Sequence, residues 1–267
     1  MSDTTETFGM PLTAVEAFEA RFVPALFTPW AERMVDATGI GAGARVLDVC
    51  CGTGAVARLA AERVGETGSV TGLDLNEAML TVARRIRPDV EFRRGNAMEL
   101  PFPDDAFDVV TCQAGLMFVP EPDRAIREMA RVVTPEGTVG LQVWDRRSEQ
   151  PAYGPLIDIV ERHAGPEALS LVNTYFVLGD RPRLEAMVRS AGLEVAETLT
   201  ESRSMRFANV DELVSLEIQG TPLGERLSED VVRKIVEDTR VALAGFANAD
   251  GSVDIPFAGH IVIAHPA

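Results

Sequence analysis

Cysteine, lysine and long apolar runs are all scarce in this chain of 267 residues. Its three cysteines are Cys50, Cys51 and Cys112. Because their number is odd and two are adjacent, we expect no disulfide framework, and no spacing of Cys and His is typical of a zinc site. No apolar run approaches the roughly 20 residues needed to span a bilayer. These absences indicate a globular protein with reduced thiols, no bound metal and no membrane span.

Lysine occurs once, at Lys234, and the formal net charge at pH 7 is −16. Such an acidic surface repels a phosphate backbone, and no cluster of Lys and Arg compensates for it locally. We therefore expect a small-molecule partner and no nucleic acid. The first nine residues are polar and acidic, unlike a secretory signal, so a cytoplasmic location is expected. The sequence leaves a monomer and a homodimer both open.

The first half of the chain alternates strand and helix patterns, which is typical of a parallel sheet with helices on both faces. The predicted strands cover residues 45–49, 69–74, 90–94, 107–112 and 138–144. The predicted helices between them cover residues 55–64, 76–86 and 123–133. Ahead of the sheet, residues 14–36 are rich in aromatic side chains. They predict a helix that packs on the sheet edge, closes over a ligand, or does both.

Beyond Asp145 the alternation of strands and helices ends. Apolar residues at helical spacing predict four more helices, at 153–163, 184–191, 210–219 and 228–246. Two more strands are predicted at 193–199 and 257–264. We expect one domain made of an N-terminal helical flap (1–40), a cofactor-binding core (41–145) and two helical lid regions that contact the substrate (146–180 and 209–250).

A hydrophobic strand runs directly into a glycine-rich turn in the segment Val46-Leu47-Asp48-Val49-Cys50-Cys51-Gly52-Thr53-Gly54. Glycines allow a tight turn and let a ligand approach the main chain. Asp74 ends the next strand, 20 residues after Gly54. From that position a carboxylate accepts hydrogen bonds from both hydroxyls of a ribose. The pattern therefore predicts a nucleoside-binding site.

This pattern alone fits more than one cofactor. The motif Gly52-x-Gly54-x-x-Ala57, followed by Asp74, also satisfies the fingerprint of an NAD-dependent oxidoreductase. Three features favour a different cofactor. Asp48 precedes the first glycine by four residues, Asn96 follows the third strand, where its amide can face an adenine, and Gln113 follows the fourth strand at the carboxyl edge of the sheet.

Together these residues resemble the class I methyltransferases, in particular the group related to the quinone-biosynthesis methyltransferases, over residues 45–144. Segments 100–110 and 127–138 are similar to the segments that lead into the fourth and fifth strands in that family. The resemblance implies a Rossmann-like, mostly parallel sheet of seven strands with helices on both faces. Its last strand, here 257–264, is antiparallel and lies between the fifth and sixth. The implied reaction moves a methyl group from S-adenosylmethionine to oxygen, nitrogen or carbon of a small organic molecule.

The resemblance also implies where the cofactor binds. The cofactor-binding residues expected on this ground are Asp48, Cys50, Gly52, Thr53, Gly54, Asp74, Leu75, Met79, Asn96, Ala97, Met98 and Gln113. Within this set, Asp48 and the glycines would contact the methionine end, Asp74 the ribose, and Gln113 the region of the sulfonium. Many relatives have Asp at the position of Asn96, and some have a histidine within the stretch that is 116–120 here.

Methyl transfer needs an aligned acceptor in a dry site and, for a hydroxyl acceptor, a general base. The candidate catalytic residues are His163 and Tyr175, and the candidate substrate contacts are Met117, Phe118, Tyr153, Tyr175 and Phe176. Each has an ordinary structural alternative, because a histidine at a helix end is often exposed and aromatic side chains often form core. Two functional alternatives stay open as well, an NAD-dependent oxidoreductase and a protein that binds S-adenosylmethionine without methyl transfer.

Overall fold

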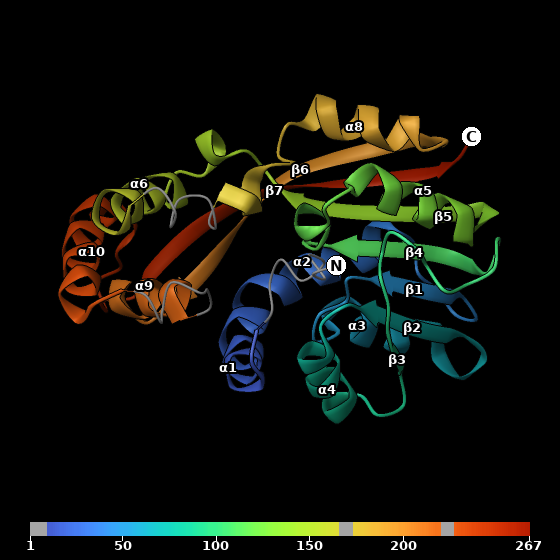
Figure 1. The fold of residues 1–267 in the computed structure, drawn as a ribbon, viewed down its shortest axis with the longest axis horizontal. Coiled ribbons are helices and arrows are strands. Elements are labelled where there is room, and N and C mark those ends of the chain that lie inside the picture. Colours follow the sequence, from blue (N-terminus) through green and yellow to red (C-terminus); the bar gives the residue numbers. More distant parts are fainter. Residues whose placement is uncertain (1–9, 166–172, 220–226) are drawn as a thin grey trace, which may run out of the picture.

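The structure is a computed structural model that describes residues 10–165, 173–219 and 227–267. Parts of the predicted flap (1–9) and of the two predicted lid regions (166–172 and 220–226) lie outside the described residues. A single seven-stranded sheet has the order β3-β2-β1-β4-β5-β7-β6 (Figure 1). Its strands are β1 Arg45–Val49, β2 Ser69–Asp74, β3 Glu91–Arg94, β4 Phe107–Gln113, β5 Val133–Trp144, β6 Leu193–Phe207 and β7 Val253–Pro266.

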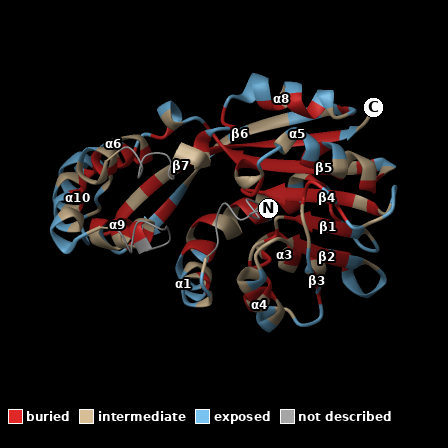
Figure 2. Ribbon diagram, viewed as in Figure 1, coloured by how far each residue is buried: buried red, intermediate tan, exposed pale blue. Residues whose placement is uncertain are grey.

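Strands β1 to β5 pair in parallel, whereas β7 is antiparallel to both of its neighbours, β5 and β6. This confirms the fold class and the strand topology predicted from the sequence. Strand β1 forms because it combines two valines and a leucine in five residues, and four of its residues are buried. The central strands are buried along their lengths, and the outer faces of the helices are exposed (Figure 2).

The helices follow the predicted order closely. They are α1 Leu12–Phe22, α2 Thr28–Ala37, α3 Ala55–Val64, α4 Glu77–Ile86, α5 Pro122–Val132, α6 Tyr153–Ala164, α8 Arg181–Ser190, α9 Val210–Gln219 and α10 Glu229–Ala242. Shorter turns are η1 Val23–Phe27, η2 Gly65–Thr67, η3 Leu116–Phe118, η4 Arg147–Glu149, η5 Thr174–Phe176 and η6 Ala244–Phe246. Helices α2 and α3 pack on one face of the sheet, and α5 and α8 pack on the other (Figure 1).

Strand β5 begins five residues earlier than the predicted start at Thr138. Its first pair joins Phe107 to Val133, the next pair joins Val109 to Thr138, and the register shifts between them. Residues 135–137, which form no part of the predicted strand at 138–144, lie in that irregularity. Sequence patterns do not mark such a strand start, because the residues before the shift pair with β4 only through tertiary structure.

Strands β6 and β7 extend far beyond the predicted ends at Leu199 and Phe257. They pair continuously from Leu193 opposite Pro266 to Phe207 opposite Val253, apart from one irregularity near Val195. The extension was missed because residues 200–206 are mostly polar and β7 contains Pro256. Helices α6, α9 and α10 gather at the far end of this long pair of strands (Figure 1). They occupy the positions that the sequence assigned to the two lid regions.

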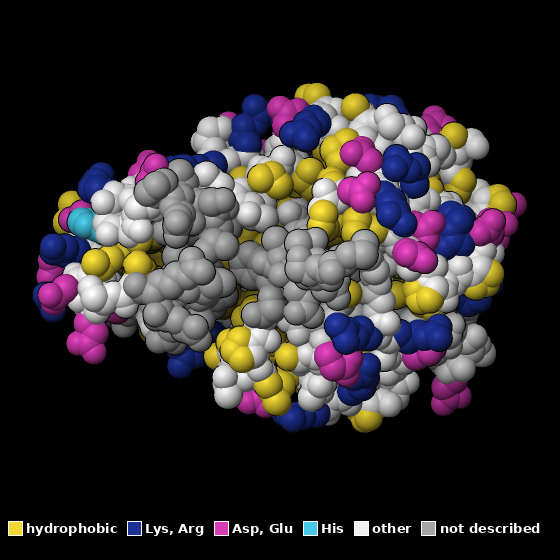
Figure 3. Space-filling model, viewed as in Figure 1, with side chains coloured by type: hydrophobic (Ala, Val, Ile, Leu, Met, Phe, Trp, Pro, Cys, Tyr) yellow, Lys and Arg dark blue, Asp and Glu magenta, His cyan; other side chains and the backbone are white. Residues whose placement is uncertain are grey.

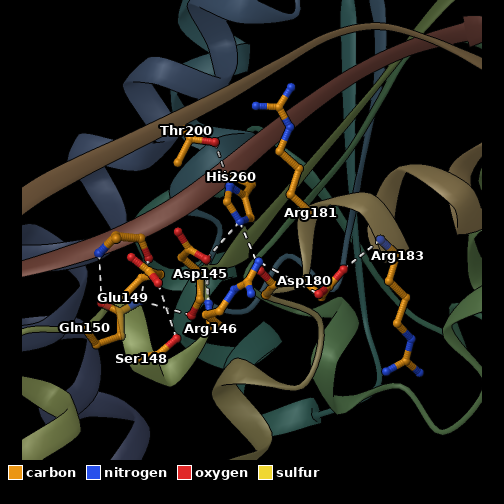
Figure 4. A network of polar contacts seen from close by, with 12 residues as sticks. Asp145, Arg146, Ser148, Glu149, Gln150, Asp180, Arg181, Arg183, Thr200 and His260 are labelled. Atoms are coloured by element: carbon orange, nitrogen blue, oxygen red, sulfur yellow. Dashed lines mark hydrogen bonds and ion pairs between the residues drawn. The ribbon is translucent and has the colours of Figure 1, made fainter.

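A buried polar network fixes the point at which the first lid region leaves the sheet. His260 of β7 is 3% exposed, and its Nδ1 lies 2.9 Å from Oγ1 of Thr200 (Figure 4). Its Nε2 lies 3.1 Å from Oδ1 of Asp145 and 3.1 Å from the backbone oxygen of Gly179. The imidazole therefore joins β6, β7, the end of β5 and the segment that leads into α8, and its role is structural.

The surface carries charges of both signs. Lys and Arg side chains are interspersed with Asp and Glu over the sheet half of the face in Figure 3, and hydrophobic side chains gather over α1. In the described ranges, no helix is both long enough and apolar enough to cross a membrane.

Candidate active site

A cavity of about 280 Å³ opens at the carboxyl ends of the parallel strands. Its lining comes from the loops after β1, β2, β3 and β4, from α1 and η1, and from residues of α6, η5, α9 and β7. The carboxyl edge of a doubly wound sheet is where ligands bind in this class of fold. One end of the cavity is therefore formed by the predicted nucleoside-binding loops, and the other by aromatic residues.

The loop after β1 is built from left-handed backbone. Cys50 has φ 56°, Gly52 has φ 55° and Gly54 has φ 87°. A Cβ added to Gly54 would lie 2.9 Å from Cζ of Phe92, so a glycine is required there for space as well as for φ. Hydrogen bonding to the Cys112 thiol, together with burial, raises the pKa of the Cys50 thiol well above its usual range. This shift disfavours the thiolate form that a nucleophilic cysteine requires.

Asp48 organises this loop from beneath. The side chain is 1% exposed, and it accepts hydrogen bonds from the backbone nitrogen of Ala57 at 3.1 Å and from Oγ1 of Thr111 at 3.0 Å. Burial raises the pKa of Asp48 to about 7, although both hydrogen bonds act in the opposite direction. Asp48 thus connects the end of β1 to the first turn of α3 and to β4.

Asp74 connects the first two loops. Its Oδ2 accepts a hydrogen bond from the backbone nitrogen of Gly52 at 2.8 Å, and its Oδ1 accepts one from that of Asn76 at 2.8 Å. Burial raises the pKa of Asp74, and these backbone hydrogen bonds partly offset the effect. An ionised carboxylate has about four acceptor positions, so two backbone bonds leave capacity for a ligand's hydroxyls.

The loop after β3 is held against Asp74. The backbone nitrogen of Gly95 donates to the backbone oxygen of Asp74 at 3.0 Å. Oδ1 of Asn96 accepts a hydrogen bond from the backbone nitrogen of Met98 at 2.9 Å, which fixes the side chain in a turn. Its amide nitrogen is not used in that bond, and Asn96 lines the cavity.

Gln113 ends β4 and faces the flap. Its Nε2 donates to the backbone oxygen of Phe27 at 2.9 Å, whereas its buried Oε1 has no hydrogen-bond partner among the described residues. A buried oxygen without a partner is costly and indicates a missing donor. Nearby, a Cβ added to Gly115 would lie 2.3 Å from Cβ of Cys50, so the loops after β1 and β4 are in close contact.

The far end of the cavity is aromatic. Ring contacts run from Phe27 to Trp144 (6.1 Å between centroids), from Trp144 to Phe257 (4.7 Å) and from Phe257 to Tyr153 (4.5 Å). Tyr175 lines the same end. Such a surface favours a flat or apolar ligand.

One carboxyl group faces this aromatic end. Glu217 of α9 is partly buried and accepts a hydrogen bond on Oε1 from the hydroxyl of Tyr153 on α6. Burial raises the pKa of Glu217 to about 7, while the hydrogen bond from Tyr153 acts to lower it. The site thus contains a carboxyl group whose pKa lies near neutral pH.

The structure brings most of the predicted site residues together. Among the predicted cofactor residues, all but Gly54 line the cavity. Of the predicted substrate contacts, Phe118, Tyr153 and Tyr175 line it. Met117 and Phe176 are buried beside it but are absent from the lining. His163 is also absent, and its Nε2 lies 2.8 Å from Oδ2 of Asp238 on α10.

The sequence did not indicate that Glu217, Trp144 and Phe257 line the cavity. For the aromatic residues of the flap it predicted packing on the sheet edge or closure over a ligand, without naming single residues. The flap residues that line the cavity are Met10, Phe18, Phe22, Val23, Leu26 and Phe27. Their sequence signal was the repeated aromatic spacing of residues 14–36. Glu217 gave no such signal, because a glutamate on an amphipathic helix is ordinarily solvated.

Comparisons with known proteins agree with this geometry. A family model for a methyltransferase domain matches residues 46–137. We call residues 46–137 the methyltransferase domain after this match. The methyltransferase domain contains the glycine-rich loop, Asp74, Asn96 and Gln113 described above. The strand order of the sheet, with β7 antiparallel to both of its neighbours, is the one that the resemblance to class I methyltransferases implied.

A relative in sequence is a demethylmenaquinone methyltransferase from Lysinibacillus sphaericus, 41% identical over 140 residues, which are 51% of this chain and 59% of that enzyme. The chain spans less than two thirds of the length of the curated relatives it matches.

Solved structures extend the likeness in fold beyond the methyltransferase domain. The phosphoethanolamine N-methyltransferase 2 of Haemonchus contortus has a TM-score of 0.61 and 20% identity over 98% of this chain and 58% of that chain. The [4+2]-cyclase SpnF has a TM-score of 0.54 and 21% identity over 90% of this chain and 80% of that chain. At these identities the likeness is one of fold alone.

In the part of the chain that the structure describes, no cluster of three or more His, Cys, Asp and Glu side chains could hold a metal ion.

Proposed function

We propose that this protein transfers a methyl group from S-adenosylmethionine to a small, largely apolar organic molecule. The observation that carries the proposal is one cavity with two unlike ends. Asp74, Asn96 and Gln113 line one end, and aromatic residues together with the carboxyl group of Glu217 line the other. A reaction between a polar nucleoside cofactor and an apolar acceptor requires both kinds of surface in one site.

The residues present fit the cofactor. Asp74 lines the cavity and has acceptor capacity beyond its two backbone bonds, which suits the two hydroxyls of a ribose. Asn96 lines the same cavity, and its amide nitrogen, which takes no part in the bond to Met98, suits an adenine edge. The buried Oε1 of Gln113 suits the cationic end, because a partial negative charge there favours a neighbouring positive charge. S-adenosylmethionine supplies, when bound, a methyl group on a positively charged sulfur.

The protein's task is then to position the acceptor and to exclude water. The flap of α1 and η1 and the helices α6 and α9 contribute cavity residues on the side away from the sheet. The aromatic rings between them offer apolar surface for a planar molecule. The similarity to demethylmenaquinone methyltransferases favours an acceptor of the quinol type, and the acidic net charge of −16 disfavours a nucleic acid.

Two other functions are compatible with parts of the site. An NAD-dependent oxidoreductase shares the glycine-rich pattern, but the family match over residues 46–137 favours a methyltransferase. A protein that binds S-adenosylmethionine without using its methyl group is the second alternative, and the likeness in fold to a [4+2]-cyclase gives it a specific basis.

Calorimetric titration with S-adenosylmethionine, S-adenosylhomocysteine and NADH tests the cofactor, and we expect the first two to bind and the third not to bind. Release of S-adenosylhomocysteine is then measured across a panel of hydroquinones, phenols and amines. Binding of NADH in place of S-adenosylmethionine would contradict the proposal. Binding of S-adenosylmethionine with no turnover on any acceptor class would favour the second alternative.

A further inference from the structure

A carboxyl group and a tyrosine from two separate helices meet at the acceptor end of the cavity. Glu217 belongs to α9 and Tyr153 to α6, 64 positions apart in the sequence, and the Tyr153 hydroxyl donates to Oε1 of Glu217. Both residues line the cavity, and Tyr153 is only 2% exposed. The methyltransferase domain at 46–137 contains neither of them.

The surroundings of Glu217 suit a proton acceptor. Burial among aromatic rings disfavours the ionised carboxylate and raises the pKa of Glu217 to about 7. A group whose pKa lies near the working pH is the most effective general base. Burial raises the pKa of Tyr153 well above its usual range, so its hydroxyl keeps its proton and donates it in the hydrogen bond to Glu217. Oε2 of Glu217 is not used in that bond.

Among the described residues on the elements around Glu217, Tyr175 keeps its proton and several charged groups pair with partners other than Glu217. Tyr175 of η5 lines the same end of the cavity, and burial raises its pKa above the usual range. On α10, which packs against α9, Arg240 pairs with Asp211 at the exposed start of α9. On β6, Arg206 pairs with Asp250 and Asp254. Around α6, Arg147 of η4 pairs with Asp158, and Arg162 and His163 pair with Asp238 of α10.

We propose that Glu217 is the catalytic proton acceptor for a substrate that carries a hydroxyl on an apolar aromatic ring, and that Tyr153 is its positioning residue. The inference rests on the proposed function. It adds the group that takes up the proton of the acceptor, which the sequence alone assigned to His163 or Tyr175.

The step balances without any further reactant. The acceptor hydroxyl gives its proton to a carboxylate oxygen of Glu217, and its oxygen uses an electron pair to form the new bond to the methyl carbon. The S–CH₃ bond breaks, and its electron pair stays on sulfur. The products are the methyl ether, S-adenosylhomocysteine and a protonated Glu217, which releases its proton to water when the product leaves.

The first test uses 2-naphthol, a phenol whose neutral and ionised forms fluoresce at different wavelengths. It is added to the full-length protein saturated with S-adenosylhomocysteine. Above pH 7 we expect emission from the naphtholate, because excitation makes the bound hydroxyl acidic enough to pass its proton to ionised Glu217. Glu217→Gln should bind 2-naphthol but emit from the neutral form. Tyr153→Phe removes a bond that lowers the pKa of Glu217, so the midpoint of the emission change should move to higher pH.

The control is Asp211→Asn, which removes a carboxylate from the same helix outside the cavity. It should behave as the wild-type protein does. Identical emission from Glu217→Gln and wild type would overturn the proposal, as would failure of 2-naphthol to bind the loaded wild-type protein. So would tighter binding of 2-naphthylmethylamine that is lost in Glu217→Gln, because the carboxylate would then bind an ammonium group.

The second test measures turnover with any hydroxyl acceptor found in the panel. Glu217→Gln should lower kcat roughly 10²–10⁴-fold, the range typical of a lost general base, with affinity for S-adenosylmethionine unchanged. Full activity of Glu217→Gln at every pH would overturn the inference while leaving the proposed function intact. Failure of the wild-type protein to bind S-adenosylmethionine would instead defeat the proposed function.

Discussion

The backbone nitrogen of Gly52 lies 2.8 Å from Oδ2 of Asp74, and this hydrogen bond joins the glycine-rich loop after β1 to the end of β2. The other oxygen of Asp74 accepts from the backbone of Asn76 at the start of α4. One carboxylate therefore sets the distance between two loops that line the cavity. Asp74 also lines the cavity itself, so the side chain that joins the two loops is also open to a ligand.

Asp74→Ala should weaken binding of S-adenosylmethionine by about 2–3 kcal/mol, because charge-assisted bonds to the ribose hydroxyls are lost. Calorimetric titration measures the change. Asp74→Asn separates the contact between the loops from the binding of the cofactor. Its amide oxygen can still accept one backbone hydrogen bond, but the side chain carries no charge. Asp89→Ala, at an exposed acidic residue outside the cavity, is the control. Unchanged affinity in a folded Asp74→Ala protein would remove Asp74 from the cofactor site.

Gly54→Ala should destabilise the protein more than Gly192→Ala. Both glycines have positive φ, 87° and 84°, so each alanine has the same backbone cost of about 1–2 kcal/mol. At Gly54 the new Cβ would also lie 2.9 Å from Phe92, whereas nothing lies within 4 Å at Gly192. Overpacking of this kind costs about 1–3 kcal/mol more. Urea unfolding of both variants gives the comparison, and equal losses would show that the Phe92 contact relaxes freely.

Tyr175→Ala and Phe176→Ala should impair use of the acceptor while leaving affinity for S-adenosylmethionine nearly unchanged. Tyr175 contacts Phe118 at 5.8 Å between ring centroids, and Phe176 contacts Phe257 at 6.0 Å. Both contacts lie toward the aromatic end of the cavity. Val177→Ala, in the same segment but 50% exposed, is the control. Hydrogen exchange with and without acceptor should show protection of this segment on binding. Equal loss of cofactor affinity and acceptor use would assign these residues to the general core.

Glu217→Gln should change how stability depends on pH. Burial raises the pKa of Glu217 from 4.5 in the unfolded chain to about 7. Between these values the folded protein binds the extra proton, so the contribution to stability is complete below about pH 4.5 and is lost as the pH rises through 7. The wild-type free energy of unfolding should therefore fall by on the order of 2 kcal/mol more than that of Glu217→Gln between pH 5 and pH 8.

Asp48 also has its pKa raised to about 7 by burial, but it is present in both proteins, so its effect cancels in this comparison. Urea unfolding at several pH values between 5 and 8 measures the difference. Parallel curves for the two proteins would mean that Glu217 is ionised throughout this range.

Treatment with EDTA should leave turnover unchanged, because the described residues contain no group of ligands that could hold a metal ion. Activity is measured before and after chelation and again after addition of Mg²⁺. A loss in EDTA that Mg²⁺ restores would show that a metal takes part in the reaction.

Local patterns were sufficient to predict the core of the fold. The strand that enters the glycine-rich turn, the position of Asp74 and the alternation of strands and helices all depend on neighbouring residues, so they were visible in the sequence. The same holds for the placement of Asn96 and Gln113, which follow directly from strand ends. These residues line one cavity because the carboxyl ends of parallel strands meet at one edge.

Other features depend on contacts between distant segments. Strand β6 continues to Phe207 because it pairs with β7 along its whole length, and its polar residues alone do not indicate a strand. The pair Glu217–Tyr153 forms because two helices meet beyond the end of that long strand pair. Burial then raises the pKa of Glu217, and burial is a property of the folded chain. The sequence by itself therefore determined the five parallel strands and the loops at their carboxyl ends, whereas only the tertiary structure decided which carboxyl group lies at the aromatic end of the cavity.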